Sequence, residues 1–442
     1  MKVLLVGNGP LPRAGESCLS FPQLRTDHFL RALLSVGHTV TVVLVGSEEG
    51  DFEGEGYHGL AVRAGGGGGL ERLRRLVDEF APDVVVGAGP FEAARLATML
   101  CGERPLWIDV PGDPFAEAQA KVPDGDDESS EEAWLGMLAA WGGALERGDA
   151  FSVISDSQAN ALHGQLGLLG RFRGVPASYK WVSSIPAAYG FGGLKPQAPT
   201  EVPPREMVVA LTGSYNTWLD DETLLDGLLL AMDSMEGLRV ISTGGGIEGF
   251  HTATWERFHL GATASRHADR FTFHGWLPHE ELPEVLSRAH VGVTLDRDGV
   301  EPLLGTRTRV LFFTHQGLRV ISTCRSDLTR ELAAANIITP IEVGDVEGLA
   351  DALRVASQSS PAQVRAAQRY MEESYSVEEI SSPLLEWVAN PTRSSKLSGD
   401  AMASLSGALE EARQQLDAIH SSVTWRLLGR VMGAVSRRRE RE

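Results

Sequence analysis

The chain has 442 residues, of which 43% are hydrophobic and 22% charged, an ordinary globular composition whose length predicts two or three domains. Its formal net charge of −19 argues against general binding to nucleic acid. Cys18, Cys101 and Cys324 lie far apart and show no disulfide framework or zinc-ligand spacing, which fits a reducing cytoplasm. The opening MKVLLVGNGP is typical of a strand and a glycine turn, so we expect neither a signal peptide nor a membrane-spanning segment.

Short apolar runs typical of buried parallel strands alternate with helical patterns in the first half of the chain. Strands are expected at 2–7, 39–45, 83–88, 106–110 and 150–155, and helices at 24–38 and 157–170. This alternation predicts a parallel, doubly wound α/β sheet. The acidic stretch 124–132 is expected to be a solvated loop insertion.

The same pattern starts again after a proline-rich, polar segment. Strands are expected at 207–213, 238–246, 270–276, 290–295, 318–323 and 338–343, and helices at 220–232, 279–289, 309–317 and 344–356. The sequence therefore predicts an N-terminal Rossmann-like domain at 1–193, a linker at 194–206 and a second such domain at 207–375, facing each other across a cleft. A closing helix at 376–393 is expected to return to the first domain.

The last part of the chain, 394–442, is predicted to be a hinge followed by an amphipathic, basic helical tail. SSKLSGD at 394–400 has the composition of a hinge, and apolar residues between Leu405 and Ile419 follow a short heptad stripe. The final segment, 421–442, carries six arginines and two glutamates, and drawn as a helix it places its apolar residues on one side. Two interpretations stay open: peripheral contact with an anionic membrane surface, or packing on the body of the protein or on another subunit.

Six segments, in their order and spacing, resemble retaining family-4 glycosyltransferases of the GT-B fold, especially a bacterial group that acts on cell-surface polysaccharide. They are LRTDHFLRALLSVGHTVTVV, IDVPGDP, SDSQANALHGQLGLLGR, GSYNTWLDDETLL, FHGWLPHEELPEVLSRAHVGV and VEPLLGTRTRVLFF. The resemblance implies a cytoplasmic enzyme whose C-terminal domain binds a nucleotide sugar as substrate. The N-terminal domain would bind a glycan, lipid-linked or protein acceptor. Transfer would retain configuration and need no metal or other cofactor.

Arg307 and Arg309 stand where the expected helix at 309–317 begins, although a helix start favours anions over cations. The leaving group of such a transferase is a nucleoside diphosphate, which a helix start and arginine side chains can bind together. The loop GSYNTWLDD, which the resemblance places beneath the diphosphate, has no basic residue, so these arginines are the candidate cations. The alternative is that they are solvated or pair with Glu301 or Asp298; two residues apart, they cannot both face one way on a helix.

Glu301 resembles the first acid of the family's paired-glutamate motif, which contacts the donor sugar. The second acid, which holds the ribose hydroxyls in the family, would fall at Phe312, and a phenyl ring cannot accept a hydrogen bond from a hydroxyl in that way. Either the ribose is held otherwise, or donor affinity or activity is reduced. The alternative for Glu301 is a surface acid before a proline turn.

The remaining candidates at the donor site come from three glycine-bearing segments and the arginine stretch. They are Gly213, Ser214, Asn216, Gly244, Gly245, Trp276, Leu277 and Thr306. A plain tight turn is an equal explanation for the glycines at 244–246, and core packing is an equal explanation for Trp276.

On the acceptor side, Gly9 and Gly15 flank the first loop, and Arg25 follows it. Asp109 ends a strand at the expected cleft, whereas Asp113 before a proline is better explained as turn chemistry. The histidines show no metal spacing, and we expect His28, His163, His274 and His279 to be structural.

Two other classes of function compete with a transferase. A non-catalytic, transferase-like binding or partner subunit would explain Phe312 and the uncharged GSYNTW loop. A sugar-nucleotide epimerase would need acidic and histidine groups around one sugar, and we cannot place such a set. No pair of carboxylates of the kind a glycosidase needs is recognisable.

Overall fold

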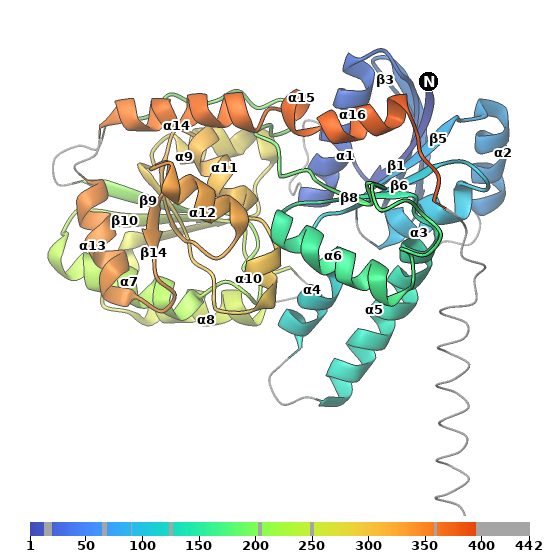
Figure 1. The fold of residues 1–442 in the computed structure, drawn as a ribbon. Helices are drawn as coiled ribbons and strands as arrows, with labels where there is room; N and C mark the ends of the chain where they lie inside the picture. The colour runs from blue at the N-terminus through green and yellow to red at the C-terminus, as the bar shows by residue number, and fades with distance from the viewer. Residues whose placement is uncertain are drawn as a thin grey trace, which may run out of the picture.

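The computed structural model describes residues 1–12, 20–63, 69–89, 91–122, 127–201, 206–247, 252–357 and 360–394. Gly15 and the predicted tail from 395 onward lie outside these ranges. The described chain forms two α/β domains that lie side by side, each built on its own sheet (Figure 1). The predicted architecture of two Rossmann-like domains in a GT-B arrangement is therefore confirmed for the described residues.

The N-terminal domain contains an eight-stranded sheet in the order β3-β4-β2-β1-β5-β6-β7-β8, and every pairing is parallel except β3 with β4. Its strands are β1 (Lys2–Asn8), β2 (Thr39–Gly46), β3 (Gly50–Gly54), β4 (Tyr57–Arg63), β5 (Val84–Ala88), β6 (Leu106–Val110), β7 (Ala150–Val153) and β8 (Val182–Ser184). Its helices are α1 (Phe21–Ser35), α2 (Leu70–Phe80), α3 (Glu92–Leu100), α4 (Pro114–Lys121), α5 (Asp127–Arg147) and α6 (Asp156–Leu168).

The C-terminal domain contains a six-stranded, fully parallel sheet in the order β11-β10-β9-β12-β13-β14. Its strands are β9 (Met207–Leu211), β10 (Leu238–Thr243), β11 (Phe271–Gly275), β12 (Val291–Thr294), β13 (Arg319–Thr323) and β14 (Thr339–Ile341). Its helices are α7 (Asp221–Ser234), α8 (Ala253–Ala264), η2 (Ala268–Arg270), η3 (His279–Glu281), α9 (Leu282–Leu286), α10 (Val300–Leu304), α11 (Thr308–His315), α12 (Asp327–Ala334) and α13 (Val346–Ala356).

In both sheets the strand order reverses at one point, and that point positions the site. The reversal lies between β1 and β5 in the first sheet and between β9 and β12 in the second. The central strands are apolar over their length because helices cover both faces; Val3, Leu4, Leu5 and Val6 of β1 are fully buried. Ligands of such folds bind beyond the carboxyl ends of the strands at the point of reversal.

Three further helices, α14 (Pro361–Ser374), α15 (Val377–Ile380) and α16 (Ser382–Ala389), run from the C-terminal domain back to the N-terminal domain (Figure 1). The Trp387 ring of α16 lies 5.4 Å from the Trp107 ring of β6, measured between ring centroids. The Tyr189 amide, ahead of the linker, donates to the Tyr375 carbonyl at 2.6 Å. The returning segment thus packs on the first domain.

Several elements differ from the sequence-based expectations. The acidic stretch 124–132 is not wholly a loop, because its residues from Asp127 onward begin the long helix α5. The single helix expected at 279–289 is a 3₁₀ turn followed by the short helix α9. The β3–β4 hairpin and helices α2, α3 and α8 were not predicted. Strand β3 is largely exposed and polar, so it has no apolar run to indicate it. Helix α2, by contrast, has a clear apolar stripe that includes Leu73, Val77 and Phe80, and sequence reasoning overlooked it.

A polar contact joins the two domains beside the cleft. The Asp327 carboxylate of α12 accepts hydrogen bonds from the amide and the hydroxyl of Ser157 in α6, both at 2.8 Å, and pairs with Arg330. The Ser155 hydroxyl donates to the Leu304 carbonyl at the end of α10, at 2.9 Å. Burial raises the pKa of Asp327, but the Ser157 hydrogen bonds and the Arg330 charge outweigh it and leave the pKa below its ordinary value.

Replacing this carboxylate should weaken the domain contact. We expect Asp327→Ala to lower the free energy of unfolding by roughly 1.5–3 kcal/mol, because hydrogen bonds to an ionised group are lost. The Asp327 contribution is complete above its ordinary pKa of 3.8 and is lost as the pH falls through the lower folded-state pKa, so variant and parent should converge in acid. Urea denaturation measures this. Asp351→Ala, which removes an exposed pair within α13, is the control; equal losses in both variants would contradict the interpretation.

Candidate functional site

Residues of both domains line a cavity of about 560 Å³ between them. The C-terminal domain contributes the loops that follow β9, β10, β11 and β12 and the start of α11. The N-terminal domain contributes the start of α1, the β6–α4 turn and α4. Ten of the predicted site residues line this cavity: Gly213, Ser214, Asn216, Gly244, Trp276, Leu277, Glu301, Thr306, Arg307 and Arg309.

Two glycine loops form the floor of the cavity at the carboxyl end of β9 and β10. Gly213 and Gly244 have φ of +80° and +85°. A Cβ on Gly244 would lie 2.3 Å from the Gly213 carbonyl oxygen, so no other residue fits there. The Gly245 amide donates to that carbonyl at 3.2 Å, and the Tyr215 amide donates to the Gly245 carbonyl at 3.0 Å. Gly245 therefore binds the two loops together and does not itself line the cavity.

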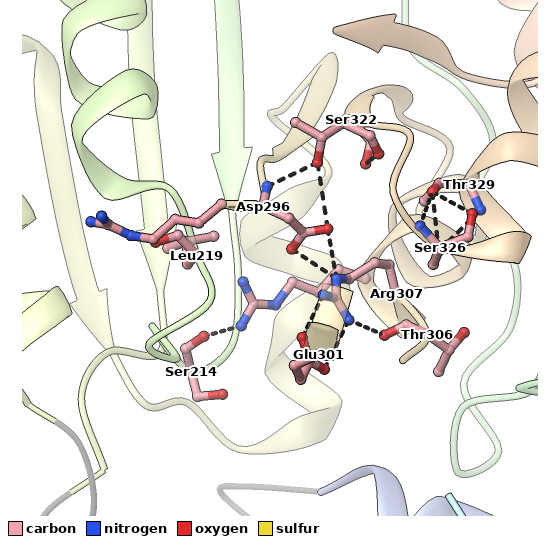
Figure 2. Close-up of polar contacts among 12 residues, drawn as sticks. Ser214, Leu219, Asp296, Glu301, Thr306, Arg307, Ser322, Ser326 and Thr329 are labelled. Carbon is pink, nitrogen blue, oxygen red and sulfur yellow. Dashed lines mark hydrogen bonds and ion pairs between the residues drawn. The ribbon is translucent and has the colours of Figure 1, made fainter. Parts of the chain in front are cut away.

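The Arg307 side chain is held between two carboxylates (Figure 2). Its Nε lies 2.7 Å from Asp296, its Nη2 lies 2.7 Å from Glu301, and only 6% of the side chain is exposed. Burial alone would lower the pKa of Arg307, but Asp296 and Glu301 together raise it above its ordinary value. Of the open alternatives, pairing with Glu301 is observed, and the second partner is Asp296 rather than Asp298.

Arg309 lies on the other side of the same helix start and has no carboxylate partner in the described chain. Its Nη2 donates to the Ser214 carbonyl (Figure 2), and its guanidinium lies against Gly213. Burial lowers the pKa of Arg309. The two arginines thus diverge as their spacing predicts: Arg307 is neutralised within the protein, and Arg309 keeps its positive charge at the cavity floor.

Two hydroxyls of the cavity lining, Thr306 Oγ1 and Thr243 Oγ1, are buried without a hydrogen-bond partner among the described residues. Helix α11 begins at Thr308, and its first amides have no partner within the helix. A positive side chain, free hydroxyls and a helix start thus line the same cavity, and such groups can bind an anionic group.

Glu301 belongs to the short helix α10 and lines the cavity while pairing with Arg307. Burial raises the pKa of Glu301, and the Arg307 charge opposes that rise. Arg307 donates to both carboxylate oxygens of Glu301, from Nη1 to Oε1 at 3.3 Å and from Nη2 to Oε2 at 2.7 Å. The charge of Glu301 is therefore balanced, but its oxygens still have lone pairs that can accept hydrogen bonds from a ligand.

One wall of the cavity is apolar and aromatic. The Phe312 ring, where the family resemblance places a ribose-binding acid, lies 5.1 Å from the Phe191 ring and meets it edge to face. Trp276 is 37% exposed, so it is not a core residue, and its Nε1 donates to the Gly246 carbonyl at 3.2 Å. Leu277 lines the cavity beside it.

The acceptor-side predictions for Arg25 and Asp109 are corrected by the structure. Both side chains are fully buried and form a two-point ion pair, at 2.9 and 2.8 Å. Arg25 also donates to the Ile185 and Pro186 carbonyls, each at 2.8 Å. Their charges satisfy each other below the cavity, so neither reaches a ligand. Gly9 lines a different hollow, beneath the β3–β4 hairpin.

Asp113 caps helix α4, accepting from the Phe115 and Ala116 amides at 3.1 and 2.9 Å, as turn chemistry predicts. His28 Nε2 contacts the Gly190 carbonyl at 2.8 Å, and burial lowers the pKa of His28 to about 3. His279 Nε2 contacts the Phe191 carbonyl at 3.0 Å and lines the cavity. His163 lies beside Phe172 on α6, and His274 is exposed on β11.

Sequence reasoning missed Asp296, Glu117 and Lys121, which all belong to the cavity wall. Asp296 follows strand β12 almost directly, so the rule that sites lie beyond strand ends could have found it. Glu117 and Lys121 are four residues apart in a helix, a spacing that places them on one face. No other sequence signal marks them.

Among the described residues, no group of three or more His, Cys, Asp or Glu side chains is arranged to hold a metal ion. The helices of the described ranges include none with the length and hydropathy needed to cross a membrane.

The described chain has the GT-B fold, and solved structures of glycosyltransferases resemble it over nearly all of its described length. Sucrose-phosphate synthase from Thermosynechococcus elongatus superimposes with a TM-score of 0.62 at 15% identity, over 88% of this chain and 98% of that chain. HepE from Anabaena, in complex with UDP and glucose, has a TM-score of 0.57 at 14% identity, over 88% and 100% of the two chains. WaaG, a glycosyltransferase involved in lipopolysaccharide biosynthesis, superimposes with a TM-score of 0.55 at 13% identity, over 89% of this chain and 100% of that chain.

At the level of the family, residues 22–192 match the model of the glycosyl transferase 4-like domain. No curated protein matches the sequence significantly. The resemblance to the family-4-like glycosyltransferases is therefore confirmed by sequence over residues 22–192, and the GT-B fold is confirmed by structure over both domains.

Proposed function

We propose that the protein is a retaining, metal-independent glycosyltransferase that moves a sugar from a nucleoside-diphosphate sugar to a hydroxyl of a glycan, lipid-linked or protein acceptor. One observation carries the proposal: Arg309, in the first turn of α11, lies against the Gly213 loop and has no carboxylate partner among the described residues. This arrangement suits a diphosphate, which is dianionic. Its oxygens can accept hydrogen bonds from the Arg309 guanidinium and from the backbone amides at the start of α11.

The two arginines would have different roles. Arg309 would bind the diphosphate and stabilise the charge that grows on it as the bond to the sugar breaks. Arg307 would hold Asp296 and Glu301 in place at the sugar end of the cavity, where their remaining lone pairs can accept hydroxyl hydrogen bonds. No side chain needs to become a nucleophile, since positioning and charge stabilisation account for such a reaction.

Structures of similar fold support the donor class. One is described as bound with UDP-2-fluoro glucose and another as a complex with UDP and glucose. We propose a nucleotide sugar as donor here on that basis, together with a cytoplasmic, bacterial role in polysaccharide synthesis and peripheral membrane contact through 421–442.

The test is release of nucleoside diphosphate from UDP-, GDP-, dTDP- and ADP-sugars. We expect slow release from one donor with water as acceptor. Absence of both release and binding, the latter measured by thermal shift with each nucleoside diphosphate, would contradict the proposal.

A non-catalytic binding subunit is the second candidate, and Phe312 favours it. An aromatic edge-to-face pair stands where the family resemblance predicts an acid for the ribose. Donor binding without turnover, together with copurification of a partner enzyme, would support this candidate over a transferase.

A further inference from the structure

The N-terminal wall of the cavity carries very little charge. The residues that line it from this domain are mostly apolar or aromatic, among them Phe21, Phe91 and Ile154. Among the described lining residues of this domain, the charged ones are Glu117 and Lys121, both on helix α4. Arg25 and Asp109 are buried beneath and cannot contribute. Whatever polar recognition this wall offers to a ligand must therefore come largely from α4.

Helix α4 is held firmly in this position. Asp113 caps its first turn and also accepts from Gln165 Nε2 at 2.8 Å, and the helix packs against α10, which carries Glu301. The β6–α4 turn leaves room for the Glu117 side chain: a Cβ on Gly112, whose φ is +108°, would lie 2.5 Å from Glu117 Oε1. The turn brings the carboxylate over the cavity.

Glu117 and Lys121 form an ion pair at 3.2 Å, with side chains that are 24% and 25% exposed. The charge of Lys121 is therefore balanced locally rather than presented to a second anion. Burial is the main cause that raises the pKa of Glu117 above its ordinary value, and the Asp113 charge adds to the rise. The positive charges of Lys121 and Arg307 oppose it. The outer oxygen lone pairs of the Glu117 carboxylate remain available to hydroxyl donors, because one Lys121 contact uses only a part of them.

We propose that Glu117 binds the acceptor, and that the acceptor unit at this wall is a neutral, hydroxyl-rich sugar rather than a phosphorylated or carboxylated one. This inference rests on the proposed function. A carboxylate accepts hydrogen bonds from sugar hydroxyls. Because Lys121 is already paired with Glu117, the described residues of this wall offer no unpaired cation to an anionic substituent. The apolar and aromatic residues around it can pack against the C–H face of a sugar ring.

The predicted substrate class differs from that of one protein of similar fold. A trehalose-phosphate synthase of Burkholderia xenovorans is described in complex with glucose-6-phosphate, at 11% identity to this chain. A wall in which the one lysine is already paired with a glutamate gives no reason to expect a phosphate at the acceptor. Arg309 lies on the C-terminal wall of the cavity. We therefore expect the anionic diphosphate of the donor to bind at that wall and a neutral acceptor to bind at the N-terminal wall.

The experiment uses the full chain and the donor accepted in the release assay. Nucleoside diphosphate release is measured with water alone, with methyl and n-octyl glycosides of glucose, galactose and mannose, and with glucose 6-phosphate. We expect at least one neutral glycoside to stimulate release and glucose 6-phosphate not to do so. Glu117→Gln should lower kcat/KM for the stimulating glycoside by about 10- to 100-fold, since it loses charge-assisted hydrogen bonds. Its dissociation constant for the nucleoside diphosphate should stay within about twofold of the parent value, because we expect the diphosphate to bind at Arg309 of the C-terminal domain and not at α4.

Glu92→Gln is the matched control, because Glu92 is an exposed acid on helix α3 that does not line the cavity. It should behave as the parent protein does. Wild-type protein that neither releases nor binds a nucleoside diphosphate defeats the proposed function itself. If the wild type is active, three results overturn the assignment of Glu117: stimulation by glucose 6-phosphate above every neutral glycoside, no stimulation by any of them, or an unchanged kcat/KM in Glu117→Gln.

Discussion

Arg309→Ala is expected to weaken binding of the nucleoside diphosphate strongly without lowering the stability of the protein. Losing one charge-assisted contact should weaken nucleoside diphosphate binding by about 1.5–3 kcal/mol, roughly 10- to 150-fold in the dissociation constant. Turnover should fall further, by about 10²–10³-fold, because the contact strengthens as charge develops on the leaving group. Isothermal titration with the nucleoside diphosphate and the release assay measure these two effects.

The stability of Arg309→Ala should not fall with its nucleotide affinity, and it can rise slightly. Burial lowers the pKa of Arg309, which means that the folded protein holds this cation at a cost, with a carbonyl rather than a carboxylate as partner. We therefore expect Arg309→Ala to unfold at the same or a slightly higher temperature. Arg239→Ala is the control, since Arg239 is exposed at the amino end of β10, away from the site. A marked loss of stability in Arg309→Ala would mean that this arginine is structural.

Arg307→Met is expected to have the opposite profile, with a large loss of stability. The substitution leaves Asp296 and Glu301, both almost fully buried, without their shared cation. Removing one partner of a buried ion pair costs about 3–5 kcal/mol, and here two carboxylates lose the same partner. Urea denaturation at neutral pH should show a loss of at least that size, together with loss of donor turnover.

The pH dependence separates this cause from simple loss of packing. Without Arg307, the folded-state pKa of Glu301 should rise still further above its ordinary value, because burial is no longer opposed. A carboxyl group with a raised folded-state pKa costs least when protonated, so the loss should shrink as the pH falls toward the ordinary glutamate pKa of 4.5 and grow as the pH rises. Arg288→Met, which removes an exposed arginine, serves as the control. A loss under about 1 kcal/mol at neutral pH would contradict the proposed role of Arg307.

The sequence was sufficient for the architecture because parallel α/β folds leave strong local signals. Buried strands such as 106–110 are continuous apolar runs, and the structure places this strand at the predicted residues. Elements without such a signal were missed, notably the β3–β4 hairpin, whose β3 residues are largely exposed and polar. The acidic start of α5 was taken for a loop because charge composition outweighed helical periodicity.

The candidate site was predicted in part, and the division follows a physical rule. Residues whose role depends on the backbone, such as Gly213 and Gly244 in their left-handed conformations, were found because glycine after a strand is itself a local signal. Residues whose role depends on charge were assigned less well, because a charge is available to a ligand only when no other part of the chain neutralises it.

By itself the sequence determined two doubly wound domains, the cleft between them, the glycine loops and an arginine pair whose members must face apart. Only the tertiary structure decided which charges remain available. Arg25 was removed from the candidates by Asp109, 84 positions away in the chain, and Arg307 was neutralised by Asp296 and Glu301. Arg309 was left without a carboxylate partner among the described residues, on the cavity wall that the C-terminal domain forms. Electrostatic pairing depends on distance in space, and in a fold built from crossover connections that distance has no fixed relation to separation along the chain.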